Sequence, residues 1–466
     1  MTYRRIAFAL ATASLCAVSV ASWAADGVPP AFNYGNAKAV PIDIERVDIN
    51  YEFNAATNET RATAVVSFHA LEAGYPFLDL VPDVTALAFD DETLSPALFK
   101  AVADPDNVTK LRVLDRLVDT AQHRLTMSYK VVSSDVTISG GRVRAAFFMS
   151  DLATGGREYF EQYGPANLEF DQVIYRFTVK VVGTTTEHEL FANGTITENG
   201  PGEWTIDYPA YFTTSSLFFH LVEKGRFKVG HFDFHGIERT VPVTVYSSSD
   251  SMTQDGMTQA QQVLAENEAA YGAVAHARFV IYLTDGGGGM EYCGATTTSL
   301  WALGHELTHS WFARGVMPAD GNSGWMDEAI ASWRDNGYPR ASSGPSGSGT
   351  NLGGFSPYRR HTTMDAYSRG ATLISQLDFL FKDTGGMKAA LKQLFAARQR
   401  TTISVPFFKT FLESASRVDL TSLFNKYVYG RNVTRGFPSV MPERFAPVNW
   451  SRHPRPYSKE ERALIH

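Results

Sequence analysis

The spacing of apolar residues changes near residue 245, and this change limits the folds that are open to the chain. Upstream of it, short segments alternate apolar and polar residues, whereas downstream apolar residues recur every three or four positions. A period of two is typical of strands with one buried face, and a period of 3.6 is typical of amphipathic helices. We therefore expect an N-terminal antiparallel β-sandwich over residues 42–245 and a mostly helical α+β domain over residues 246–435.

Individual segments support this division. The expected strands are VDINYEF, RATAVVSFHA, HRLTMSYKVV, YRFTVKVVG and PVTVYSS, which Gly, Asn and Asp clusters separate. The expected helices occupy residues 257–274, 299–314, 325–336, 366–381, 386–398 and 405–415, and a strand at 278–285 follows the first of them. Segments without periodicity predict an extended leader at 26–41, a flexible Gly/Ser-rich loop at 341–356 and an extended C-terminal tail at 436–466.

The first 25 residues have the features of a secretory signal peptide. Arg4 and Arg5 precede an apolar run from Ile6 to Val20, and the small residues Ser22, Ala24 and Ala25 follow it. A basic start, an apolar core of this length and a small-residue cleavage site predict export and removal of residues 1–25. We therefore expect the mature protein in the periplasm or in the medium.

Removal of the signal peptide leaves 40 basic and 49 acidic residues, a net charge of −9, and one cysteine, Cys293. An acidic chain gives no reason to expect a nucleic acid as partner. A single cysteine excludes an internal disulfide, and no other stretch is apolar enough for a transmembrane segment in the mature chain. The 44% of hydrophobic and 12% of aromatic residues exclude an intrinsically disordered protein.

One motif carries catalytic chemistry. His305, Glu306 and His309 form H-E-x-x-H, and an 18-residue gap separates His309 from Glu328 in WMDEAIASW. Two histidines four positions apart on a helix face the same way and can bind one metal ion, and the glutamate between them can take a proton from a metal-bound water. Catalytic zinc has three protein ligands and one water, so Glu328 is the candidate third ligand.

The two segments, GHELTHSWFARGV and WMDEAIASW, resemble the zinc aminopeptidase family that includes alanyl aminopeptidase and leukotriene hydrolase. That family also has an upstream G-x-M-E-N strand and a downstream Y-x-K-G tyrosine. The corresponding residues here are Gly288-Gly289-Met290-Glu291-Tyr292 and Tyr367-Ser368-Arg369-Gly370. The resemblance covers about residues 42–430 and implies a thermolysin-like catalytic domain after the β-sandwich. The GGMEY segment also has a weaker similarity to the glycyl aminopeptidases.

The resemblance implies a role for each matching residue. His305, His309 and Glu328 would bind one zinc ion per chain, and Glu306 would be the general base. Tyr367 would donate a hydrogen bond to the substrate oxygen that gains negative charge. The substrate-binding residues would be Glu291, which would bind the free α-amine of a peptide or protein substrate, and Gly288 and Gly289, which would let the peptide backbone lie against the strand.

Structural roles compete with several of these assignments. Tyr367 is equally suited to the edge of the core, and Glu291 to an exposed position after a glycine turn. Cys293 is expected to be a small buried residue, because no base is evident beside it. Asp327 is either a hydrogen-bond partner of a metal-binding histidine or a solvated helix residue. Trp311, Trp325 and Trp333 are expected to pack in the core. Glu161 and Gln162 are candidates for a second contact to the substrate amine.

Three departures from the family pattern leave the reaction open. Tyr292 replaces Asn, Arg369 replaces Lys, and Glu291 lies only 14 residues before His305. The chain also ends soon after the last expected helix, which predicts a more open cleft, partly covered by the 341–356 loop. The expected function is an exported zinc aminopeptidase. The alternatives are a zinc endopeptidase or amidase on the same scaffold, or a secreted binding protein with a non-catalytic zinc site.

Overall fold

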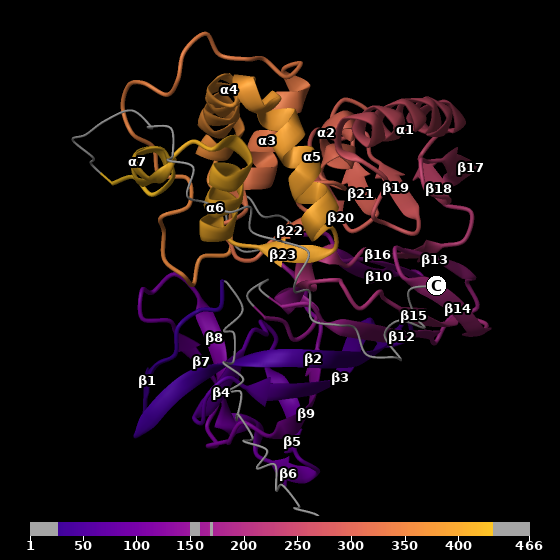
Figure 1. The fold of residues 1–466 in the computed structure, drawn as a ribbon. Helices are drawn as coiled ribbons and strands as arrows, with labels where there is room; N and C mark the ends of the chain where they lie inside the picture. The colour runs from indigo at the N-terminus through magenta and orange to yellow at the C-terminus, as the bar shows by residue number, and fades with distance from the viewer. Residues whose placement is uncertain (1–26, 150–158, 168–170, 432–466) are drawn as a thin grey trace, which may run out of the picture.

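The computed structural model describes residues 27–149, 159–167 and 171–431. The predicted signal peptide at 1–25 and the predicted tail at 436–466 lie outside the described residues. A strand-rich N-terminal part and a largely helical C-terminal part lie one above the other (Figure 1). Among the described residues, no helix is both long and apolar enough to cross a membrane.

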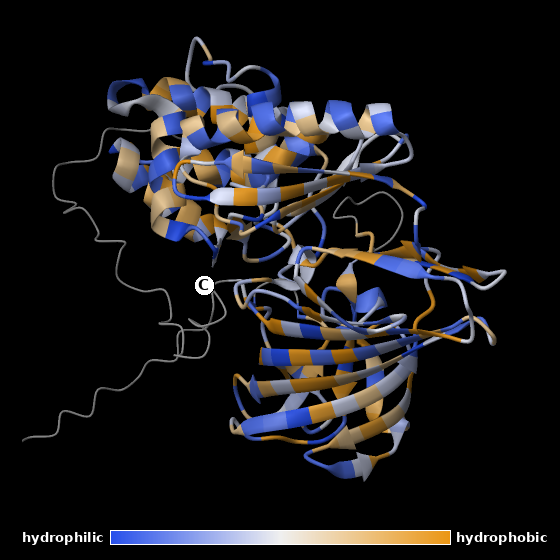
Figure 2. Cartoon of the chain, turned by 90° about the vertical axis from the view of Figure 1, so that its right-hand side faces the viewer, coloured by the Kyte–Doolittle hydropathy of each residue, from blue (hydrophilic) through white to orange (hydrophobic). Residues whose placement is uncertain are grey.

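The N-terminal part is built from two sheets, which curl around a common core (Figure 2). The central strands of the larger sheet are β2 and β3, which pair antiparallel from Ile42 to Asn54 of β2 with one register shift near Ile44. The burial of β3 alternates residue by residue, as its sequence pattern predicts. The larger sheet consists of β1 (Phe32–Tyr34), β2 (Ala37–Asn54), β3 (Glu59–Ala70), β4 (Tyr75–Leu78), β5 (Val84–Phe89), β6 (Glu92–Leu94), β7 (Phe99–Ala103), β8 (Lys110–Leu114), β9 (Gln122–Lys130), β12 (Ile174–Val182), β14 (Thr195–Gly200) and β15 (Glu203–Asp207). The smaller sheet consists of β10 (Val136–Ser139), β11 (Arg142–Ala146), β13 (His188–Ala192) and β16 (Phe219–Glu223).

The sheet-rich N-terminal fold is confirmed, with two corrections. The segment at 26–41 is not an exposed leader, because β1 and the first residues of β2 belong to the sheet and Ala39 and Val40 are fully buried. The Pro and Gly residues of this segment interrupt the alternation of apolar and polar residues, so the strands could not be predicted from the sequence. The sheet is also not purely antiparallel, since β2 pairs in parallel with both β4 and β12.

The C-terminal part combines a five-stranded sheet with helices packed on it (Figure 1). The sheet order is β17-β18-β19-β21-β20, so β20 is an edge strand. Its strands are β17 (Lys228–His235), β18 (Thr240–Ser247), β19 (Phe279–Leu283), β20 (Gly289–Tyr292) and β21 (Ala295–Thr298). The helices are α1 (Asp250–Tyr271), α2 (Leu303–Thr308), α3 (Trp325–Asp335), α4 (Ala371–Leu380), α5 (Gly386–Arg398), α6 (Val405–Ser416) and α7 (Thr421–Leu423), and a small parallel pair joins β22 (Val316–Pro318) to β23 (Thr401–Ile403). The remaining turns of helix are η1 (Pro96–Leu98), η2 (Phe160–Gln162), η3 (Thr214–Ser216), η4 (Ala366–Gly370), η5 (Lys382–Thr384) and η6 (Phe424–Val428).

Two predicted boundaries in this part are wrong. β17 and β18 belong to the catalytic sheet rather than to the sandwich, so the division lies before residue 228 instead of at 245. Alternation predicts a strand but not the sheet that it joins. The helix expected over 299–314 is regular only in α2, because the chain after it tightens to i−3 hydrogen bonds at Ser310 and Trp311.

The Gly/Ser-rich loop, which we expected to cover part of the cleft, is fastened along α4 and η6. Ala341 N–H donates to the carbonyl of Ser375 in α4, and Leu352 N–H donates to the carbonyl of Val428 in η6 at 2.8 Å. Beyond the loop, Tyr358 returns to the N-terminal sheet, where it is buried and its hydroxyl donates to the carbonyl of Pro30. These contacts tie the helical part to the sheet below it.

Candidate active site

Two helices bring the predicted metal ligands together. His305 lies within α2, His309 is the residue that caps the C-terminal end of α2, and Glu328 lies in the first turn of α3. His305 Nε2 is 3.0 Å from Glu328 Oε2, and His309 Nε2 is 3.5 Å from the same oxygen. One donor atom from each of the three side chains lies within 4.8 Å of the other two.

This arrangement fits a tetrahedral zinc ion. Bonds of about 2.0–2.1 Å in tetrahedral geometry place neighbouring donor atoms about 3.3 Å apart, and the two observed separations are close to that distance. The Nε2 atom of His309 is buried and has no hydrogen-bond partner. A buried imidazole nitrogen with no partner is costly, so a metal ion is the natural occupant of the space in front of it.

The opposite nitrogens of both histidines are held by hydrogen bonds. His305 Nδ1 lies 2.6 Å from Asp335 Oδ2, and His309 Nδ1 lies 3.1 Å from the carbonyl oxygen of Phe312. Such partners fix the ring so that Nε2 faces the metal. Sequence reasoning missed Asp335. Its spacing of seven residues from Glu328, two turns on the same face of α3, was the signal that pointed to it.

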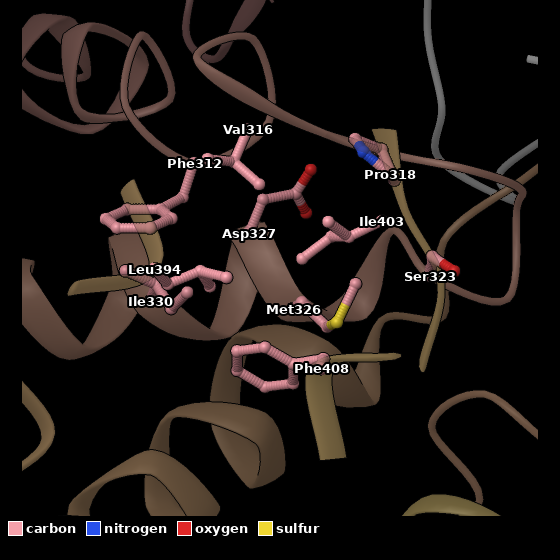
Figure 3. Close-up of a pocket in the computed structure, with 10 residues that line it drawn as sticks. All are labelled: Phe312, Val316, Pro318, Ser323, Met326, Asp327, Ile330, Leu394, Ile403 and Phe408. Carbon is pink, nitrogen blue, oxygen red and sulfur yellow. The ribbon is translucent and has the colours of Figure 1, made fainter. Parts of the chain in front are cut away.

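Asp327, which sequence reasoning proposed as such a partner, has another position. Its Oδ1 accepts the backbone N–H of Glu328 at 2.7 Å, and its side chain is buried. Figure 3 shows the carboxylate in a small apolar pocket, between Val316, Pro318 and Ile403. Burial in that pocket raises the pKa of Asp327 well above its ordinary value. Asp327 therefore binds the backbone of its neighbour Glu328 within the first turn of α3, and it is neither solvated nor a partner of a metal-binding histidine.

Glu306 lies beside the ligands and is almost completely buried. Its Oε2 atom has no hydrogen-bond partner, and its carboxylate lies within 4.8 Å of the donor atoms of Glu291 and His309. Burial, and secondarily the charge of Glu291, raise the pKa of Glu306 to about 8. A carboxylate with a raised pKa readily takes up a proton, as a general base must.

Gly289 makes room for this carboxylate. A Cβ atom at position 289 would lie 2.5 Å from Glu306 Oε1 and 2.6 Å from Glu306 Cδ. Gly289 was predicted to contact a substrate backbone. The structure adds a second role, because the missing side chain of Gly289 leaves space for the side chain of Glu306. Gly288 has open space in front of it and a φ of +89°, which favours glycine.

Tyr367 lies over the metal ligands. Its ring is nearly parallel to that of His305, with the two centroids 6.0 Å apart. It belongs to η4, a turn of π-helix, which packs so closely on α3 that a Cβ at Gly370 would come within 2.8 Å of Ala329 Cβ. Arg369, by contrast, is half exposed and faces Asp365. The structure thus brings Tyr367 to the site and leaves Arg369 outside it.

Glu291 reaches the site from the edge strand β20, but it is already paired. Arg314 Nη2 donates to Glu291 Oε1 at 3.0 Å, and both side chains are buried. This cation escaped the sequence analysis, because Arg314 is separated from Glu291 by 22 residues and follows no metal-ligand spacing. Glu291 remains near the metal ligands despite this pairing.

The residues that follow Glu291 are buried in the core of the protein. Tyr292, which replaces the expected Asn, is fully buried, and its hydroxyl accepts the backbone N–H of Met149. Cys293 is buried too; burial raises the pKa of its thiol to about 12, so it is not a nucleophile. The packing role of Trp311, Trp325 and Trp333 is confirmed, since all three are buried. Glu161 is buried in η2, and the role of Glu161 and Gln162 stays a prediction.

The carboxylate that binds both histidines has a lowered pKa. Burial alone raises the pKa of Glu328, but His309 and His305 outweigh it and hold that pKa far below its ordinary value. For His305, burial disfavours the charged form, yet hydrogen bonds to Asp335 and Glu328 raise its pKa to about 10. The site therefore holds an ionised glutamate beside two histidines, which together are a donor set that suits zinc once each histidine has released its extra proton to bind the metal.

Comparison with known proteins places this geometry in a known fold. Among solved structures, the chain is similar to aminopeptidase A of Legionella pneumophila, with a TM-score of 0.64, 12% identity and coverage of 84% of this chain and 50% of that chain. It is also similar to an M1 zinc metallopeptidase from Deinococcus radiodurans, with a TM-score of 0.59, 16% identity and coverage of 88% and 98%. The chain has the fold of the M1 zinc metallopeptidases.

Yeast LTA4 hydrolase shares the M1 fold, with a TM-score of 0.57, 12% identity and coverage of 85% of this chain and 69% of that one. The chain spans about half the length of the Legionella enzyme and nearly all of the Deinococcus one. No protein-family model matches its sequence, and no curated protein matches it either. The M1 fold confirms the architecture that the motifs predicted, while activity and substrate rest on the site itself.

Proposed function

We propose that the chain is a zinc-dependent aminopeptidase that releases N-terminal residues from peptides. The observation that carries this proposal is the convergence of His305, His309 and Glu328, whose donor atoms lie within 4.8 Å of one another, with the Glu306 carboxylate beside them. His305, His309 and Glu328 would hold one zinc ion. The ion would polarise the scissile carbonyl and lower the pKa of a bound water.

The protein supplies the proton transfers. Glu306 takes a proton from the attacking water and passes it to the leaving amine, which its raised pKa favours. Gly289 leaves Glu306 the space to approach. Tyr367 donates its phenolic hydrogen to the carbonyl oxygen as that oxygen gains negative charge, since a phenol stays protonated at neutral pH.

The proposed amine subsite is Glu291. A free ammonium in a buried cleft needs a carboxylate partner, and the Glu291 carboxylate lies next to the general base Glu306. With the amine held there, the first peptide bond reaches the metal ligands. β20, which carries Glu291, is an edge strand of its sheet, a position where an extended peptide can add as a further strand.

The test is turnover of peptide amides with a free amine and with an N-acetylated amine. We expect kcat/KM to be about 100-fold lower for the acetylated substrates, because they lack the ammonium. We also expect a chelator to abolish turnover and added zinc to restore it. Equal turnover of free and blocked substrates would support the second candidate, a zinc endopeptidase or amidase, which the pairing of Glu291 with Arg314 favours.

We further propose that the protein works outside the cytoplasm, because residues 1–25 have the pattern of a cleavable signal. Cell fractionation and N-terminal sequencing test this. Recovery of the full-length chain from the cytoplasm would contradict it.

A further inference from the structure

A buried arginine ties together three parts of the molecule at the edge of the site. Arg314 follows α2, and its backbone N–H donates to the carbonyl of His309 at 2.8 Å. Its guanidinium donates to Ser215 Oγ in η3 at 2.6 Å and to both the backbone oxygen and the carboxylate of Glu291. The chain turns into this position through Ala313, whose φ of +132° is unusual for a residue other than glycine.

Glu291 would not stay in place on its own. One carboxylate oxygen of Glu291 lies within 4.8 Å of one of Glu306 inside the protein, and the two groups repel whenever both are ionised, as Glu306 must be when it acts as the base. A buried carboxylate with rotatable side-chain bonds turns away from such a neighbour unless an opposite charge holds it. Arg314 supplies that positive charge. Its Nη2 atom lies 3.0 Å from Glu291 Oε1.

We propose that Arg314 is a positioning residue that holds Glu291 in the metal pocket against Glu306 and thereby sets the preference for a free N-terminal amine. This inference rests on the proposed function. Arg314 acts through Glu291, because its guanidinium is engaged by Glu291 and Ser215. By binding Oε1 and the backbone oxygen of Glu291 it fixes the direction of the side chain, and the carboxylate keeps further acceptor sites for an ammonium.

An arginine suits this role better than a lysine. The planar guanidinium donates in several fixed directions at once, and here it satisfies acceptors on Glu291 and on Ser215. A lysine keeps the positive charge but has a single ammonium group, which cannot donate to several acceptors in fixed, coplanar directions. Arg314→Lys should therefore retain part of the effect, whereas Arg314→Met should remove it.

The experiment measures binding of two ligands that differ only in the ammonium, L-phenylalanine and 3-phenylpropanoate, to the zinc-loaded full-length protein by calorimetry. We expect the wild-type protein to prefer phenylalanine, and this preference to fall about tenfold in Arg314→Met and less in Arg314→Lys. The matched control is Arg112→Met, which removes another buried arginine bound to backbone carbonyls, at Leu80 and Val81, far from the metal ligands in the sequence. It should lower stability and leave the preference unchanged.

A double-mutant cycle with Glu291→Gln completes the test. If Arg314 acts through Glu291, Arg314→Met lowers the preference no further once Glu291 is Gln. The proposal would be overturned if the two substitutions lowered the preference additively. It would also be overturned if Arg314→Met folded, bound its full complement of zinc and kept or increased the preference. Should Arg314→Met not fold, a wild-type preference in Arg314→Lys and in Ser215→Ala would overturn it. Turnover of peptides tests the proposed function separately, because a zinc peptidase without amine preference would still cleave them.

Discussion

Replacing Gly289 by Ala should displace the general base while leaving the fold intact. The added Cβ would lie 2.5 Å from Glu306 Oε1, so the carboxylate must move by about 0.9 Å to reach an ordinary contact of 3.4 Å. A misplacement of about 1 Å in a catalytic group costs roughly 100-fold in rate. Because the atoms in the way belong to the end of a side chain, we expect little loss of stability.

The assay compares kcat/KM, zinc content and melting temperature between the wild-type protein and Gly289→Ala. Gly287→Ala is the matched control, because a Cβ at Gly287 meets no atom within 4 Å. We expect kcat/KM to fall about 100-fold in Gly289→Ala, with zinc retained, and to change little in Gly287→Ala. A fall of less than about threefold in Gly289→Ala would show that the position of Glu306 does not limit the reaction and would refute the reasoning.

Other expectations concern metal binding, catalysis and pH. Asp335→Asn should weaken zinc binding about 10–100-fold in a competition with a chromophoric chelator, whereas Asp365→Asn, on an exposed residue paired with Arg369, should not; equal losses would contradict the role of Asp335. Tyr367→Phe should lower kcat by about 100-fold or more with little change in KM, and an unchanged kcat would assign the tyrosine to packing. Burial lowers the pKa of His220 and His276 to about 3, so the unfolded chain binds protons that the folded one does not as the pH falls below about 6.5. Urea unfolding should therefore show a loss of about 2 kcal/mol per histidine between pH 7 and pH 5, and equal stability at both would contradict this.

The sequence predicted the parts of the site that follow local rules. His305 and His309 are four residues apart on one helix, and that spacing alone places both imidazoles on one face. Glu328 followed from the third protein ligand that a catalytic zinc ion requires, and the family resemblance then supported its spacing. Tyr367 needed that resemblance as well, since nothing in its own helix distinguishes a catalytic tyrosine from one at the edge of the core.

The parts that the sequence did not predict depend on contacts between distant segments. Arg314 meets Glu291 and Ser215 only because the chain turns after α2 and η3 lies against β20. The boundary near residue 228 was missed for the same reason, since PVTVYSS alternates like a sandwich strand but lies in β18 of the catalytic sheet, where it pairs with β17. Periodicity describes the faces of an element and not its partner.

The most direct test of the account is the product pattern from a short unblocked peptide, followed by mass spectrometry, with zinc-loaded wild-type protein and Glu306→Gln side by side. The account predicts that the wild-type protein releases residues one at a time from the N-terminus. It also predicts that Glu306→Gln releases none, while it retains one zinc ion per chain. Internal cleavage by the wild-type protein would contradict the aminopeptidase, and turnover by Glu306→Gln at the wild-type rate would contradict the mechanism.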